Sequence, residues 1–130
     1  MPLMESQILT EKAELKYLNL AFDEGDEVIP LMKQALMEAG IDNAKIVGCS
    51  GIIRQGIMNY FQKSFYKSRE LNNTRVMNGS GRFVKEGNDF RGDFHIAVLI
   101  GSQYWNGTLV KGIASDGFSI RIEFISFLTQ

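Results

Sequence analysis

One acid and the single histidine of this sequence lie close enough to act together. They occur in GDFHIAVLIG, residues 92–101, where Asp93 stands two residues before His95. Side chains alternate along a strand, so Asp93 and His95 are expected on one face, about 6–7 Å apart from the ~3.3 Å rise per residue. That separation suits two ligands of one metal or one shared water. The opposite face is expected to be core and holds Phe90, Phe94, Ile96, Val98 and Ile100.

A metal at this position would need more than these two residues. Zinc at a catalytic site usually takes three protein ligands, and an isolated imidazole and carboxylate would hold it poorly. A lone histidine on a strand face is most often only hydrogen-bonded there. The sequence therefore favours no tightly bound cofactor, and it leaves a weak divalent-metal site at Asp93 and His95 as the alternative.

A second candidate is the segment YFQKSFYKSR, residues 60–69, in which basic and aromatic residues are interleaved. Cations that contact the backbone and aromatic rings that stack on bases are the means of non-specific single-strand binding. A strand end followed by a solvated basic loop would look the same. The nucleic-acid candidates are Lys63, Lys67 and Arg69, with Phe61, Phe65 and Tyr66 between them.

Two further motifs favour structural roles. Cys49 is the only cysteine, which excludes an internal disulfide and a cysteine zinc cluster, and its apolar surroundings indicate a buried small hydrophobe. The stretches NGSG and GCSG lack the Gly-Lys-Ser/Thr ending of a phosphate-binding loop, so strand glycines are favoured. The sequence therefore favours a non-enzymatic protein, without excluding an enzyme.

Charge is balanced across the chain but unevenly placed. The 130 residues carry a net charge of −1, which excludes a global basic field. Residues 54–91 hold 8 Lys/Arg against 3 Asp/Glu, whereas residues 1–53 hold 4 against 9. The sequence has neither a signal-peptide pattern nor an apolar run long enough to span a bilayer, so we expect a cytoplasmic protein with no membrane partner.

The elements that must position these residues follow from periodicity. An apolar stripe over residues 26–39 predicts a long helix, with Asp26 as N-cap and Gly40 after its end. Residues 44–61 predict two strands or one long bent strand, residues 62–73 a polar loop, and residues 86–89 (EGND) a hairpin turn. The predicted fold class is α+β: one long helix packed on a mostly antiparallel or mixed sheet of about six to seven strands. Residues 1–130 are expected to form a single domain with a flexible lead over residues 1–13.

Several predicted strands are apolar on both faces, more than one helix can cover. Candidates for burial by another subunit are Ile125, Phe127 and Leu128 near the end of the chain.

Three stretches, read together, resemble the plants-and-prokaryotes-conserved (PPC) domain. The first is residues 25–61, the second is NGSGRF at residues 78–83, and the third is HIAVLIG followed by NGTLVKGI, residues 95–101 and 106–113. The order and spacing of all three carry the resemblance, since each alone is only glycine and apolar spacing. In the first stretch the matching residues are Gly25, Asp26, Gly40, Ile41, Gly48, Gly51, Tyr60 and Phe61.

The resemblance implies a sheet domain that forms a homotrimer, and a DNA-binding or transcription-related role, because plant members carry AT-hooks. This sequence has no Arg-Gly-Arg-Pro core of an AT-hook, so DNA binding is expected to be weak or without sequence specificity. Many prokaryotic members have a metal-binding His triplet, and the corresponding positions here are Asp93, His95 and Ile113. We therefore expect a polar pocket near a subunit boundary; its small ligand is unknown, and an enzyme using the Asp93/His95 face remains the alternative.

Overall fold

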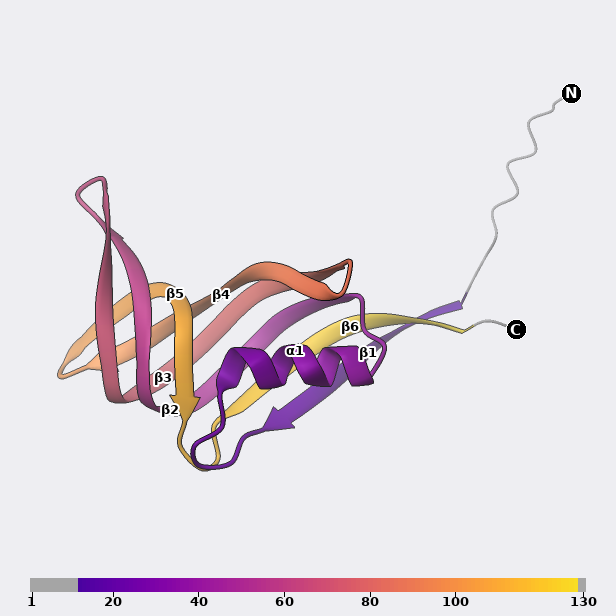
Figure 1. The fold of residues 1–130 in the computed structure, drawn as a ribbon, viewed down its shortest axis with the longest axis horizontal. Coiled ribbons are helices and arrows are strands. Elements are labelled where there is room, and N and C mark those ends of the chain that lie inside the picture. Colours follow the sequence, from indigo (N-terminus) through magenta and orange to yellow (C-terminus); the bar gives the residue numbers. More distant parts are fainter. Residues whose placement is uncertain (1–11, 129–130) are drawn as a thin grey trace, which may run out of the picture.

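The computed structural model describes residues 12–128, most of which lie in six strands (Figure 1). The strand order is β1-β6-β2-β3-β4-β5, and neighbouring strands are antiparallel. Among these residues, no helix has the length and apolar character needed to cross a membrane. The elements are β1 (Lys12–Ala21), α1 (Val28–Glu38), β2 (Asn43–Gln62), β3 (Phe65–Glu86), β4 (Asp89–Ile100), β5 (Gln103–Ala114) and β6 (Ser119–Leu128).

The sheet closes on itself because β5 returns to β2. The first half of β2 pairs with β6 between Lys45 and Ser50, and the second half pairs with β5 between Ile53 and Asn59. β3 runs along the other edge of β2 and continues to β4. The strands β2, β3, β4 and β5 thus form a closed ring of pairings, from which β6 and β1 extend (Figure 1).

Two glycines allow the close contact at which this ring closes. Gly56 of β2 lies opposite Gly112 of β5. A Cβ on Gly56 would lie 2.6 Å from the carbonyl oxygen of Lys111 and 3.1 Å from the Cα of Gly112. The two backbones therefore approach more closely than a side chain on Gly56 would allow.

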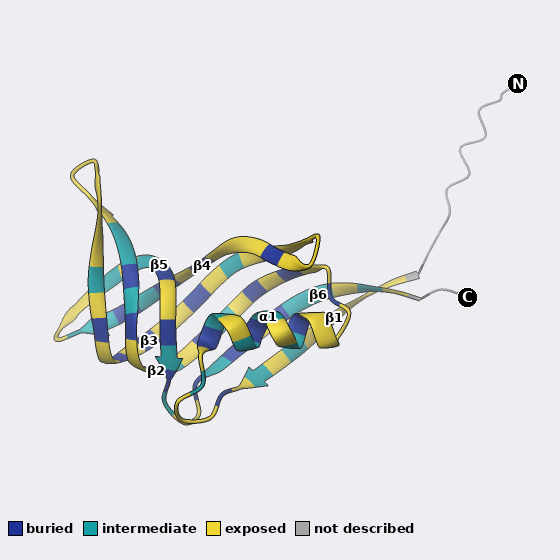
Figure 2. Cartoon of the chain, viewed as in Figure 1, coloured by how far each residue is buried: buried dark blue, intermediate teal, exposed yellow. Residues whose placement is uncertain are grey.

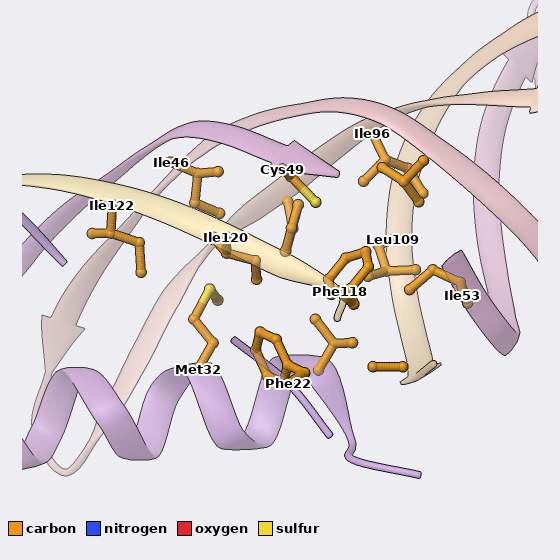
Figure 3. Close-up of a cluster of buried hydrophobic side chains, with 14 of the residues drawn as sticks. Phe22, Met32, Ile46, Cys49, Ile53, Ile96, Leu109, Phe118, Ile120 and Ile122 are labelled. Atoms are coloured by element: carbon orange, nitrogen blue, oxygen red, sulfur yellow. The ribbon is translucent and has the colours of Figure 1, made fainter. Parts of the chain in front are cut away.

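The core lies on the inner face of the curved sheet, and α1 covers one part of it (Figure 2). Val28, Met32 and Leu36 form the buried stripe of the helix. Figure 3 shows Met32 pointing from α1 toward the strand that carries Ile120. Beside them the rings of Phe22 and Phe118 pack 5.7 Å apart, centroid to centroid.

The predicted fold class, in which one long helix packs on the sheet, is wrong. The structure is mostly antiparallel sheet with a single 11-residue helix. The helix starts late because Asp26 does not cap it: its carboxylate accepts the Asp23 amide at 2.8 Å, and its carbonyl accepts the amide of Ala114. Since the sheet curls, it buries much of its own apolar face and needs little helical cover.

The predicted polar loop over residues 62–73 is also wrong. Apart from Lys63 and Ser64, these residues lie in strands, so that β2 and β3 form one long hairpin with a two-residue turn. Both turn residues have positive φ, 49° and 70°. Asn and Gly usually mark such turns, so neither residue signalled this one.

Other local predictions have mixed outcomes. Residues 44–61 lie in one long strand, the second of the two alternatives, and its pairing is irregular near Gly48 and Gln55. The EGND turn is confirmed, with Gly87 at φ 64°. Of the predicted flexible lead, residues 12 and 13 belong to β1, and residues 1–11 lie outside the described part of the chain.

The contact between Gly56 and β5 predicts a specific loss of stability. Replacing Gly56 with Ala forces the backbones of β2 and β5 apart, and overpacking of this kind lowers the free energy of unfolding by about 1–3 kcal/mol. Gly48→Ala is the matched control, since the nearest atom to its new Cβ is 3.9 Å away. Urea unfolding at fixed protein concentration measures both variants. Equal stability of the two would contradict this account of the closure.

Candidate functional site

His95 lies on the outer face of the closed ring. On the two strands that flank β4, its partners in register are Ser80 of β3 and Thr108 of β5. Its Nδ1 lies 3.3 Å from the hydroxyl oxygen of Thr108. His95 and Asp93 are exposed while Phe94 and Ile96 are buried, so the predicted division of β4 into two faces is confirmed.

A row of uncharged polar residues crosses the ring at the level of His95. β5 pairs with β4 on one edge and with β2 on the other. Thr108 of β5 therefore lies between His95 of β4 and Asn59 of β2. Asn59 in turn pairs with Ser68 of β3, whose hydroxyl donates to the Asn59 side-chain oxygen at 2.7 Å. The polar row is Ser80, His95, Thr108, Asn59 and Ser68.

A surface depression of about 470 Å³ is lined by four members of this row, all except Ser68. Its lining includes the aromatic residues Tyr60, Phe61 and Tyr66 and, besides Asn59, the amides of Asn78 and Asn106. Its lining contains no Asp, Glu, Lys or Arg. It is therefore a neutral depression that offers hydrogen-bond donors, acceptors and aromatic surface.

Charged residues flank the neutral depression in balanced pairs. On one side Arg82 of β3 lies opposite Asp93 of β4. On the other side Lys111 of β5 and Glu70 of β3 both lie next to Ile57 of β2. Each flanking row thus holds one base and one acid, so neither gives the depression a strong field of one sign.

The three positions of the family triplet do not come together within one chain. Asp93 and His95 share a face, but Ile113 lies opposite Gln55 and forms a bridge with Glu27, in a different pocket. Within residues 12–128, no group of three His, Cys, Asp or Glu side chains could hold a metal ion. These residues do not fit a metal by themselves, and the weak metal site at Asp93 and His95 stays a prediction that needs ligands from elsewhere.

The nucleic-acid candidates lie on the β2–β3 hairpin in three different environments. Lys63 occupies the turn, and Lys67 is exposed opposite Tyr60. Arg69 is half-buried, with its guanidinium 4.5 Å from the ring centroid of Trp105. Lys63 and Lys67 are thus free to contact a ligand, whereas Arg69 is held by a cation–π interaction.

The aromatic residues of the hairpin separate onto two faces. Phe61 pairs with Tyr66 on the face of the polar row, and their rings pack edge to face at 5.2 Å. These side chains are 64% and 80% exposed. Lys67 and Arg69 alternate with Tyr66 and therefore point to the opposite face. The residues that appear interleaved in sequence do not form one mixed surface.

Sequence reasoning missed most of the polar row. Asn59, Ser68, Ser80 and Thr108 are ordinary strand residues, and only the register brings them beside His95. Alternation of polar and apolar residues in residues 104–109 was a usable signal for an outward polar face. The pairing of β5 with β2 has no local signal, because those strands are about fifty residues apart.

The glycine stretches and Cys49 have structural roles. A Cβ on Gly79 would lie 2.5 Å from the Cβ of Cys49, so NGSG makes room for the core and does not form a phosphate loop. Cys49 is buried, and burial raises the pKa of its thiol to about 12. A thiol in this environment stays protonated and is a poor nucleophile.

This pKa predicts the reactivity of Cys49. Because the folded state favours the protonated thiol, an aromatic disulfide reagent at pH 8 should modify the native protein far more slowly than the protein in denaturant. Reactivity should rise only as the pH approaches about 12 or as the protein unfolds. Rapid, complete modification of the native protein would show that the thiol is accessible.

No family model and no curated protein matches this sequence. Solved structures do share its fold. The metal-containing protein of Archaeoglobus fulgidus superposes with a TM-score of 0.74 at 19% identity, covering 90% of this chain and 85% of that chain. A plant- and prokaryote-conserved (PPC) protein of Pyrococcus horikoshii gives 0.70 at 18% identity, covering 95% and 87%. A "putative DNA binding protein" from Bacteroides thetaiotaomicron gives 0.70 at 17% identity, covering 86% and 83%.

These identities show the fold alone. The resemblance to the PPC domain is thereby confirmed at the level of structure: the chain has the fold of a PPC protein.

Proposed function

We propose that this protein is a homotrimeric DNA-binding module, with weak or no sequence specificity, that contacts the nucleic-acid backbone through its β2–β3 hairpin. The main support for the proposal is that, within residues 12–128, the end of this hairpin has no neighbouring strand on either side. β2 leaves β5 at Asn59, and β3 meets β4 only from Arg75 onward. The end of the hairpin, around the turn at Lys63 and Ser64, projects beyond the rest of the sheet (Figure 1).

The chemistry of the hairpin suits a nucleic acid. Lys63 at the turn and Lys67 beside it are exposed, and three exposed aromatic residues accompany them. Cations that neutralise phosphates bind without reading sequence. The name of the Bacteroides neighbour supports DNA as the ligand. The net charge of −1 supports weak binding.

Assembly as a trimer is supported by apolar surface at the other end of the sheet. Leu15 of β1 pairs with Ile125 of β6, and Ile125 and Phe127 are 57% and 60% exposed. The side chain of Leu128, the third residue expected there, lies outside the described residues. Three copies of one domain over residues 1–130 can cover these residues in a closed ring and leave each hairpin free.

Neutralising the hairpin should weaken DNA binding independently of sequence. We expect the double variant Lys63→Ala/Lys67→Ala to lose affinity by a similar factor for oligonucleotides of unrelated sequence. The slope of log K against log salt should fall by about 1 for each lysine that contacts phosphate. Fluorescence anisotropy over a range of salt concentrations measures both effects.

The control for each hairpin lysine is Lys85→Ala, which removes one such charge from an exposed position at the far end of β3. It should bind as the unmodified protein does. An equal loss with Lys85→Ala, or tight salt-resistant binding of one duplex, would contradict the proposed role of the hairpin.

The trimer predicts a mass in solution about three times the 14.6 kDa of one chain. Phe127→Lys should shift light scattering coupled to size exclusion toward the monomer, because a charge cannot be buried cheaply in the interface. Met37→Lys on α1, which is also exposed, is the control and should stay trimeric. A monomeric mass for the unmodified protein would contradict the proposed trimer.

A further inference from the structure

We infer that the neutral depression holds an unpaired nucleobase, so that this protein prefers single-stranded over duplex DNA. This inference rests on the proposed function and names the form of nucleic acid that the site accepts. The hairpin that carries Lys63 at its turn also carries Phe61 and Tyr66, which border the depression. A strand that contacts the turn with its backbone can therefore place a base beside these two rings.

The aromatic pair gives the base a stacking surface. Phe61 and Tyr66 meet edge to face at an interplanar angle of 72°, so the edge of one ring contacts one face of the other, and the remaining ring faces are not stacked on each other. Both remain largely exposed although they lie on strands with fixed backbones. Base stacking on aromatic side chains is tolerant of sequence, since every base has a π-face. This agrees with a module that has little sequence specificity.

The floor of the depression suits the edge of a neutral base better than a phosphate. Asn59 and Asn106 each have an amide that can donate and accept hydrogen bonds, as base edges do. Thr108 and Ser80 add hydroxyl groups. The lining contains His95 but no Lys or Arg, and the flanking Arg82 lies opposite Asp93. The phosphates are thus expected at Lys63 of the turn, and the base in the depression.

The size and exposure of the site favour an unstacked base. A volume of about 470 Å³ falls within the ~300–1,000 Å³ of common small-ligand pockets. In a duplex both faces of a base are stacked and its pairing edge is occupied. An aromatic platform with amides below it can use these surfaces only when the base is single-stranded or flipped out. The depression therefore distinguishes the two forms of DNA.

The test compares one labelled sequence as a single strand and as a duplex, with about 12 nucleotides, within the ~4–16 that single-strand sites occupy. We expect the single strand to bind more tightly. Tyr66→Ala should weaken single-strand binding about tenfold, the fold-change of ~1.4 kcal/mol of lost stacking, and should leave duplex binding within about twofold. A 2-aminopurine base in the strand should be quenched on binding, and this quenching should be lost in Tyr66→Ala.

Tyr104→Ala is the matched control, since Tyr104 is 67% exposed on β5 but does not line the depression. It should bind the single strand as the unmodified protein does. Thermal unfolding checks that both variants remain folded. Equal binding of strand and duplex, dependent on Lys63 and Lys67 but not on Tyr66, would overturn this inference and leave the proposed function standing. Binding of neither form would overturn the proposed function itself.

Discussion

The pairing of β5 with the second half of β2 is the constraint on which the rest of the structure depends. It brings Gly56 opposite Gly112, and a Cβ on Gly56 would lie 2.6 Å from the carbonyl oxygen of Lys111. The contact places Asn59 beside Thr108 and so completes the polar row across β4, β5, β2 and β3. It also ends at Asn59, which releases the remainder of the hairpin from the sheet. The closure of the ring and the free end of the β2–β3 hairpin therefore both follow from the register between β2 and β5.

The same register explains how charge and aromatic surface are distributed. Because side chains alternate along a strand, Phe61 and Tyr66 lie on the outer face with His95. Arg69 lies on the other face, where it contacts Trp105. One cation is thereby held within the fold, while Lys63 and Lys67 stay free. The depression remains neutral because its charged neighbours occur as one acid and one base in each flanking row. A polar depression beside the turn that carries Lys63 results from these placements.

Local patterns predicted the parts of the molecule that depend on neighbouring residues. Alternation identified the core face of β4, and helical spacing indicated an apolar stripe over residues 26–39, of which Val28, Met32 and Leu36 are buried. The length of the helix was overestimated because Asp26 looks like a cap, although its oxygens serve the preceding turn and β5. The hairpin was missed because Lys63 and Ser64 adopt positive φ without glycine or asparagine. The polar row depends on register between distant strands, which local periodicity does not determine.

The central proposal is that nucleic acid contacts the free hairpin and the neutral depression beside it. Backbone amide chemical shifts of the isotope-labelled protein, titrated with a single-stranded oligonucleotide, test this claim most directly. We predict that the largest changes occur at Phe61, Lys63 and Tyr66 of the hairpin and at Asn106 and Thr108 of β5. Changes confined to α1 or to the β1–β6 end of the sheet, or no changes at all, would contradict it.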